Sequence, residues 1–149
     1  MLARFLSPYL LRDAGYYPVL TLTGPRQSGK TTLARATFPG HAYVSLEDPE
    51  ARQFARDDPR GFLGRYAGPV IIDEAQRVPD LFSYIQTAVD RDPTGGRFVL
   101  TGSHNFLLLQ QEKRKDQKNN HFFQASVFPH GKGSFQASQV VDEVCSQKR

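Results

Sequence analysis

The segment GPRQSGKT, residues 24–31, is the strongest indication of fold in this chain. It matches the phosphate-binding pattern G-x-x-x-x-G-K-[ST], which requires a strand directly before it and a helix directly after it. Both are predicted, because YPVLTLT at 17–23 is a short β-rich run and Lys30–Thr37 continues as a helix until Pro39 and Gly40 end it. The stretch therefore predicts a P-loop that binds a nucleotide.

The residue types in this stretch suit phosphate binding. Gly24 and Gly29 let backbone N–H groups approach phosphate oxygens, and the helix N-terminus favours anions. Lys30 would place its ammonium against the β and γ phosphates, and the Thr31 hydroxyl would bind Mg²⁺. The alternative, a glycine-rich turn that only caps a core helix, is disfavoured by the flanking strand and helix. The residues predicted to bind the nucleotide are Gly24, Pro25, Arg26, Gln27, Ser28, Gly29, Lys30, Thr31 and Thr32.

A second motif is PVIIDEAQ, residues 69–76. Its apolar residues 70–72 are typical of a buried parallel strand, at whose carboxyl end ligands bind. We expect Asp73 to hold Mg²⁺ and Glu74 to polarise the attacking water. Without the P-loop, a core strand ending in an acidic turn would be the preferred interpretation; with it, function is favoured.

A third apolar run, RFVLTGSHN at 97–105, ends in small and polar residues. Ser103 or Asn105 could reach the γ-phosphate or the attacking water, but such residues also form turns and helix N-caps, and the two interpretations have similar weight. The residues predicted to take part in catalysis are Lys30, Glu74, Ser103 and Asn105.

The remaining pattern predicts alternating strands and helices. A strand is expected at 42–46, with helices at about 49–56 and 81–90, and residues 1–11 indicate an amphipathic helix rather than a signal peptide. Strands separated by helices imply an α/β fold, a three-layer parallel sheet with helices on both faces.

Composition limits the functional class. The chain has 149 residues, 39% hydrophobic and 23% charged, and no apolar run approaches the length of a membrane span, so we expect a cytoplasmic protein without a membrane role. A single cysteine and four scattered histidines indicate neither a disulfide framework nor structural zinc. The net charge of +4 suggests nucleic acid, but most of the excess lies after residue 109.

The composition changes near Leu109. Residues 1–109 contain 11 Arg and 1 Lys, whereas residues 110–149 contain 2 Arg and 5 Lys, and Gln rises from 4 to 7. The run QQEKRKDQKNN at 110–120 is too polar to bury a face. We therefore predict a partial ATP-binding domain at 1–109 and a polar, irregular tail at 110–149.

Four segments, GPRQSGKTTL, AYVSLEDPEARQFARDDPRGFL, GPVIIDEAQ and FVLTGSHNFLL, in that order, resemble the prokaryotic AAA-type ATPases that carry a carboxy-terminal domain called DUF4143. The resemblance covers about residues 1–109. It implies that the three motifs are Walker A, Walker B and sensor 1, that ATP and Mg²⁺ bind, and that Ser103 or Asn105 is the sensor.

The chain departs from this family after residue 109. The family has a fifth strand, a basic finger region and a further domain there, and this chain has the polar run instead. We expect a truncated or frame-disrupted member, in which the absence of the fifth strand leaves Val19–Thr23 as an unprotected sheet edge.

The leading functional interpretation is an ATP-binding module. Hydrolysis to ADP and phosphate is left open, because Arg77, Arg91 and Arg97 are finger candidates only by elimination. One alternative is a nucleic-acid-stimulated, helicase-like motor, suggested by DEAQ at 73–76. Another is a regulatory protein that binds nucleotide without hydrolysing it. The expected partners are ATP, an unidentified protein and, in a complete relative, further copies; nucleic acid and membranes are not favoured.

Overall fold

The computed structural model describes residues 2–25, 28–103 and 122–126, and the side chains of 6–25 and 28–103. One parallel sheet forms its centre, with the strand order β2-β3-β4-β1-β5. The strands are β1 (Val19–Thr23), β2 (Ala42–Ser45), β3 (Val70–Asp73), β4 (Phe98–Gly102) and β5 (Phe122–Ser126). The helices are α1 (Leu2–Ala14), α2 (Lys30–Thr37), α3 (Pro49–Asp57), α4 (Pro59–Arg65) and α5 (Leu81–Arg91), with a 3-10 turn η1 (Ala75–Arg77).

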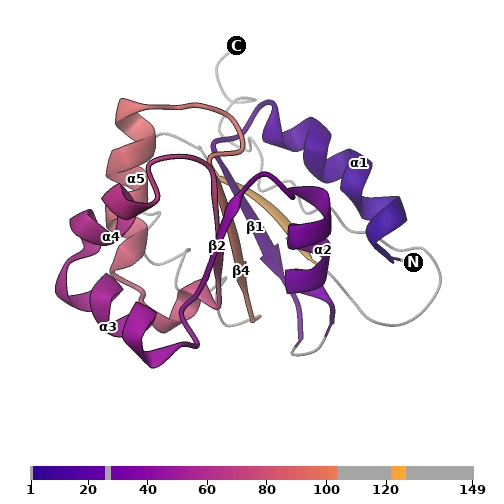
Figure 1. The fold of residues 1–149 in the computed structure, drawn as a ribbon. Coiled ribbons are helices and arrows are strands. Elements are labelled where there is room, and N and C mark those ends of the chain that lie inside the picture. Colours follow the sequence, from indigo (N-terminus) through magenta and orange to yellow (C-terminus); the bar gives the residue numbers. More distant parts are fainter. Residues whose placement is uncertain (1, 26–27, 104–121, 127–149) are drawn as a thin grey trace, which may run out of the picture.

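Helices cover both faces of this sheet. Figure 1 shows α1 and α2 on one side and α3, α4 and α5 on the other, with β2 at the near edge. The predicted three-layer α/β fold is therefore confirmed. The four strands expected within 17–101 are all present, and α2 has the predicted bounds.

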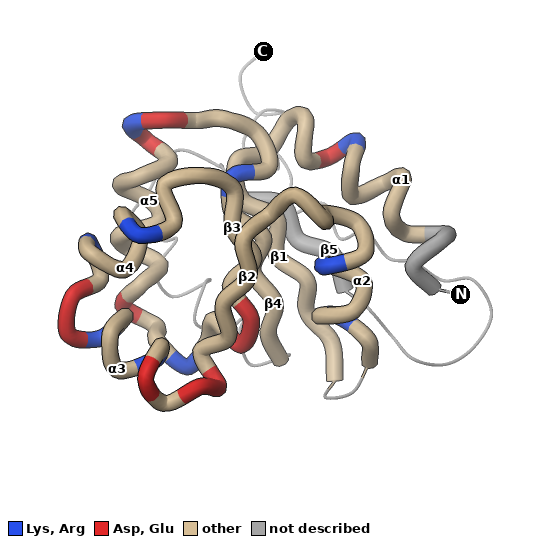
Figure 2. Tube along the Cα trace, in the orientation of Figure 1, with Lys and Arg blue, Asp and Glu red and all other residues tan. Residues whose placement is uncertain are grey.

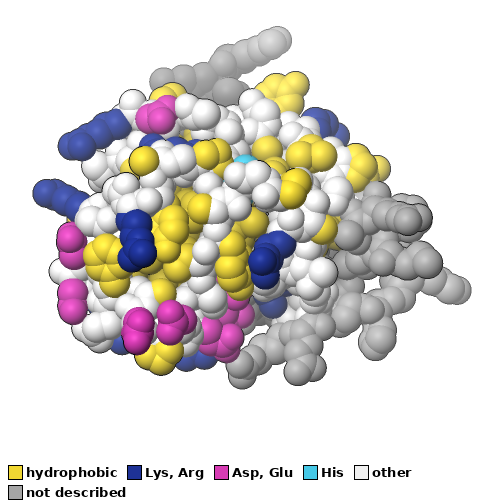
Figure 3. All heavy atoms as spheres, viewed as in Figure 1, with side chains coloured by type: hydrophobic (Ala, Val, Ile, Leu, Met, Phe, Trp, Pro, Cys, Tyr) yellow, Lys and Arg dark blue, Asp and Glu magenta, His cyan; other side chains and the backbone are white. Residues whose placement is uncertain are grey.

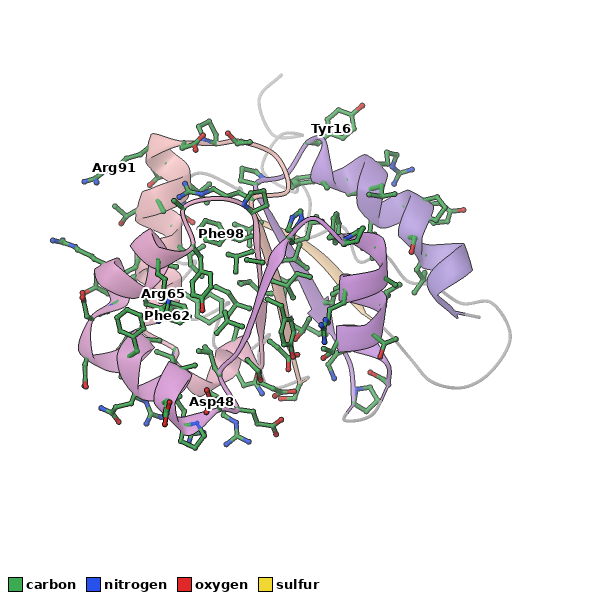
Figure 4. The ribbon with its side chains drawn as sticks, viewed as in Figure 1. Tyr16, Asp48, Phe62, Arg65, Arg91 and Phe98 are labelled. Atoms are coloured by element: carbon green, nitrogen blue, oxygen red, sulfur yellow. The ribbon has the colours of Figure 1, made fainter. Side chains whose placement is uncertain are left out.

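Each face of the sheet has its own hydrophobic core, because neighbouring residues of a strand point to opposite sides. Ile72 and Phe98 pack in the layer with Phe62 of α4, whereas Ile71 packs with Leu10 and the first turns of α2 on the other side. Figure 4 shows Phe62 and Phe98 pointing into the space between helices and sheet. Fully burying a side chain of this size contributes about 1.5–3 kcal/mol.

Helix α4 was not predicted from the sequence. Asp58 ends α3 and also caps α4, where its carboxylate accepts a hydrogen bond from Gly61 N at 2.9 Å, and Pro59 occupies the first helical turn. The same arrangement starts α3, with Asp48 as N-cap followed by a proline. The repeated Asp-Pro pair was therefore a usable sequence signal, since both residues favour helix starts.

The expectation that β1 would be an unprotected edge is wrong. Strand β5 pairs with β1 in parallel along its whole length, with Thr21 opposite Gln124. The physical reason is that bare backbone donors and acceptors at a sheet edge pair with any extended segment, without needing the apolar pattern by which strands are predicted. The boundary at Leu109 remains a prediction, and the rest of 110–149 lies outside the described residues.

Within the described part of the chain, none of the helices has both the length and the apolar character that a membrane span requires.

Candidate nucleotide site

In the loop between β1 and α2 the structure describes residues 24, 25, 28 and 29. Gly29 caps α2 with φ of 83°, a conformation that side chains rarely adopt. Ser28 is buried, and its hydroxyl has no hydrogen-bond partner among the described residues. The loop therefore offers a buried donor next to a helix N-terminus, a combination that suits an anionic ligand.

Lys30 is held inside this loop. Lys30 is only 5% exposed to solvent. Its ammonium donates hydrogen bonds to Gly24 O at 3.1 Å and to Pro25 O at 2.9 Å. Both acceptors are backbone carbonyls of the loop itself, so the ammonium charge is solvated without being neutralised. The positive charge thus lies within the loop, beside Gly24 and Pro25.

Asp73 ends β3 at the centre of four hydroxyl donors, the hydroxyl cluster formed by Thr31, Tyr43, Ser45 and Thr101. Its Oδ1 accepts from Thr31 Oγ1 at 2.6 Å and from Thr101 Oγ1. Its Oδ2 accepts from Tyr43 OH at 3.3 Å and from Ser45 Oγ at 3.2 Å. No described Lys or Arg forms an ion pair with Asp73, so its buried side chain is available to bind a cation.

Tyr43 occupies a position with two charged neighbours. Its ring lies below the Arg35 guanidinium, 4.4 Å from centroid to Cζ. Partial burial, and then the nearby Asp73 carboxylate, raise the pKa of the Tyr43 phenol above its ordinary value. The phenol therefore remains a hydrogen-bond donor at neutral pH.

Glu74 follows Asp73 in a left-handed backbone conformation, with φ of 55° and ψ of 43°. Its N–H donates to Thr101 Oγ1 at 3.3 Å, and its carboxylate accepts from the Gln76 side chain. Such backbone is uncommon for a residue with a side chain and costs about 1–3 kcal/mol, which concentrates it at functional sites. The 3-10 turn η1, whose Arg77 N donates to Glu74 O at 3.0 Å, holds this conformation in place.

The structure brings most of the predicted site residues to one end of the sheet. Gly24, Lys30, Thr31 and Asp73 are joined by the contacts above. Ser103 is half-buried directly after β4, and Thr32 is exposed on α2. Arg26, Gln27 and Asn105 lie outside the described residues.

Sequence reasoning missed three members of the hydroxyl cluster. Tyr43, Ser45 and Thr101 contact Asp73 because β2 and β4 lie on either side of β3, with Ser45 opposite Asp73. The available signal was weak: Ser45 and Thr101 are hydroxyl residues at or near the carboxyl end of a predicted strand, whereas Tyr43 is near the start of its strand. Only the strand order shows which strands are neighbours.

The donor set of the cluster fits Mg²⁺. This ion binds through one or two carboxylates together with phosphates and water, rather than in an all-protein cage. The described residues contain no group of three or more His, Cys, Asp or Glu side chains that could hold a metal, but they place Thr31 Oγ1 2.6 Å from Asp73 Oδ1. A hydroxyl and a carboxylate beside the P-loop are what Mg²⁺ needs from the protein.

Acidic residues surround the carboxyl end of β2. Glu47, Asp48 and Glu50 are exposed in the loop after β2 and the first turn of α3. Figures 2 and 3 show Asp and Glu gathered along this lower margin of the molecule. A cavity of about 640 Å³ lies elsewhere, between α4 and α5. The finger candidates Arg91 and Arg97 line it, but none of the residues predicted to bind nucleotide or metal or to take part in catalysis does. The candidate site is thus the open loop end of the sheet.

A model of the AAA domain family matches residues 16–129. The chain belongs to this AAA domain family. The matched region includes the P-loop, Asp73, Glu74 and β5, so it extends beyond the expected boundary at Leu109. Membership supports the AAA-type, P-loop nature expected from the four resembling segments.

The AAA domain also aligns with longer proteins. Two uncharacterized proteins, one from Mycobacterium bovis and one from Mycobacterium tuberculosis, are each 43% identical over 89 residues, which is 58% of this chain. The aligned region spans only 20% of each relative. A solved structure of PCH-2 from C. elegans covers 83% of this chain and 42% of its own chain, with a TM-score of 0.45 and 13% identity.

Proposed function

We propose that this AAA domain binds ATP as its magnesium complex. Lys30 neutralises the β and γ phosphates, residues 24–32 surround them, and Thr31 and Asp73 hold the metal. The observation that carries this proposal is the 2.6 Å hydrogen bond from Thr31 to Asp73, which unites two motifs 42 residues apart. The AAA family membership supports ATP as the nucleotide.

Hydrolysis of the γ-phosphate is the reaction that this arrangement supports. Glu74 is the group proposed to polarise the attacking water, with Ser103 or Asn105 as the sensor of the γ-phosphate. Support comes from the fixed backbone of Glu74 and from its position directly after Asp73. The exposed acidic residues after β2 disfavour nucleic-acid phosphates beside the site.

The larger protein context is also a proposal. The four resembling segments support a relationship to proteins with a carboxy-terminal DUF4143 domain, in which the AAA domain acts on an unidentified protein partner and assembles with further copies.

The binding proposal is tested by nucleotide affinity in Lys30→Ala. A fluorescent ATP analogue titrated with the full chain in Mg²⁺ should bind at least about tenfold more weakly to the variant, since hydrogen bonds to charged groups contribute about 1.5–3 kcal/mol. Arg65→Ala is the control, because it removes a charge from α4 on the other side of the sheet. Equal affinity of wild type and Lys30→Ala would exclude this site.

The hydrolysis proposal is tested separately, by measuring the rate of phosphate release from ATP. Glu74→Gln should bind ATP as the wild type does and lose turnover about 100-fold or more, in the range of a general base. ATP binding with no turnover in either protein would instead support a regulatory, non-hydrolysing domain.

A further inference from the structure

The edge strand β2 presents two hydroxyls to the same carboxylate oxygen. Tyr43 and Ser45 are two residues apart, so their side chains lie on the same face of the strand. Ser45 is directly opposite Asp73 in the parallel register. Both hydroxyls donate to Asp73 Oδ2, at 3.3 Å and 3.2 Å. We call these two residues the β2 hydroxyl pair.

The pair is itself fixed by other contacts. Tyr43 is held by the Arg35 guanidinium of α2, the helix that follows the P-loop. Ser45 Oγ accepts a hydrogen bond from Glu47 N at 3.2 Å, and Leu46 N donates to Asp73 O at 2.9 Å. The pair therefore ties Asp73 to both α2 and the end of β2.

The two oxygens of Asp73 have separate sets of partners. Thr31 and Thr101 donate to Oδ1, whereas within the described residues Oδ2 accepts only from the β2 hydroxyl pair. Rotation of the carboxylate about its Cβ–Cγ bond would break both sets. The orientation of the charge that faces Thr31 is thus set jointly by β4 and by the edge strand β2.

We propose that Tyr43 and Ser45 are positioning residues for magnesium. They act through Asp73: by holding Oδ2, they keep Oδ1 directed at the Thr31 hydroxyl, where the metal is needed. This inference rests on the proposed magnesium–ATP function and goes beyond it, because it makes metal affinity depend on a strand outside the three nucleotide motifs.

Loss of the pair should weaken metal binding. Without it Oδ2 would have neither donor, and the carboxylate would turn to find water or another hydroxyl. Removing partners that orient a metal ligand typically lowers metal affinity about 10–100-fold. The phosphates are bound by the P-loop and Lys30, so nucleotide affinity without metal should not change.

The experiment measures metal and nucleotide affinity separately in the full chain. Mn²⁺, a paramagnetic substitute for Mg²⁺, is titrated by electron paramagnetic resonance in the presence of a non-hydrolysable ATP analogue. Nucleotide affinity is measured in EDTA with a fluorescent analogue. In Tyr43→Phe/Ser45→Ala, Mn²⁺ affinity should fall about tenfold or more, and nucleotide affinity in EDTA should stay within about twofold of wild type.

Two control variants match the substitutions. Tyr84→Phe removes a phenol that also lies beside an arginine, Arg60, at 5.9 Å, but on α5, and Ser83→Ala removes an exposed hydroxyl from the same helix. Both should bind Mn²⁺ as the wild type does. Ser45→Thr keeps the hydroxyl on β2 and should also retain metal affinity.

Three outcomes would overturn the inference. They are unchanged Mn²⁺ affinity in the double variant, an equal loss of nucleotide affinity in EDTA, and a loss of Mn²⁺ affinity in Ser45→Thr as large as in the double variant. If the wild type binds nucleotide and metal but the double variant loses neither, only this inference fails. If the wild type shows no metal-dependent nucleotide binding, the proposed function fails with it.

Discussion

Thr101 links the two acidic residues of the candidate site. It is fully buried, its hydroxyl donates to Asp73 Oδ1, and it accepts from Glu74 N at 3.3 Å. One side chain therefore satisfies a buried carboxylate and a backbone donor whose residue has strained geometry. These contacts make Thr101 a structural determinant of the site that acts through Asp73 and Glu74.

Thr101→Val should destabilise the fold. Valine has the same shape but leaves Asp73 with one donor fewer and Glu74 N without its acceptor, and a buried polar group left unsatisfied costs about 1–3 kcal/mol. Urea denaturation in EDTA measures the free energy of unfolding. Thr87→Val, on the exposed face of α5, is the control and should change it by less than about 0.5 kcal/mol. Equal effects of the two substitutions would contradict the role assigned to the Thr101 hydroxyl.

The sequence predicted some of the site residues and missed others. Lys30, Thr31 and Asp73 were predicted because the chemistry of phosphate and magnesium fixes their spacing within short motifs. Tyr43 and Ser45 were missed because their role depends on β2 lying beside β3, which is a property of strand order. No local pattern encodes which strands become neighbours.

Among the helices and strands, too, the sequence predicted most elements and missed others. Apolar runs and Pro-Gly breaks predicted β1 to β4, α2, α3 and α5 closely, because buried parallel strands and amphipathic helices have distinct periods. Helix α4 was missed because Gly61 and Gly64 weaken a helical pattern of seven residues. Strand β5 was missed because its residues, FFQAS, follow the polar run at 110–120 and show no sustained apolar pattern.

Gly64 and Gly95 differ in the space that surrounds them. Gly64 lies in α4, and a Cβ there would have nothing within 4 Å, so Gly64→Ala should stabilise the fold by about 0.5–1 kcal/mol. A Cβ on Gly95 would lie 2.3 Å from Ala14 O, where the end of α1 meets the turn before β4. Gly95→Ala should therefore destabilise by about 1–3 kcal/mol, as overpacking does. Thermal or urea unfolding of both variants checks the opposite signs, and a shared sign would contradict the packing of α1.

The sheet includes a strand from beyond residue 109, β5, which pairs with β1. Strand β1 carries the P-loop at its carboxyl end and lies between β4 and β5, whereas β2 is at an edge. Backbone amides paired on both sides of a strand open only with larger parts of the structure. Hydrogen exchange of the full chain should thus be slower in Val19–Thr23 than in Ala42–Ser45.

Proline in β5 tests whether this pairing protects β1. Neighbouring N–H groups of a strand point to opposite sides, so only one of Phe123→Pro and Gln124→Pro removes a donor that faces β1. That variant should accelerate exchange of the β1 amides, and the other serves as its matched control, because it alters the side of β5 that faces away from β1. If neither substitution changes exchange in β1, the P-loop strand would be stabilised by β4 and the flanking helices alone, and the segment 122–126 would be dispensable for the nucleotide site.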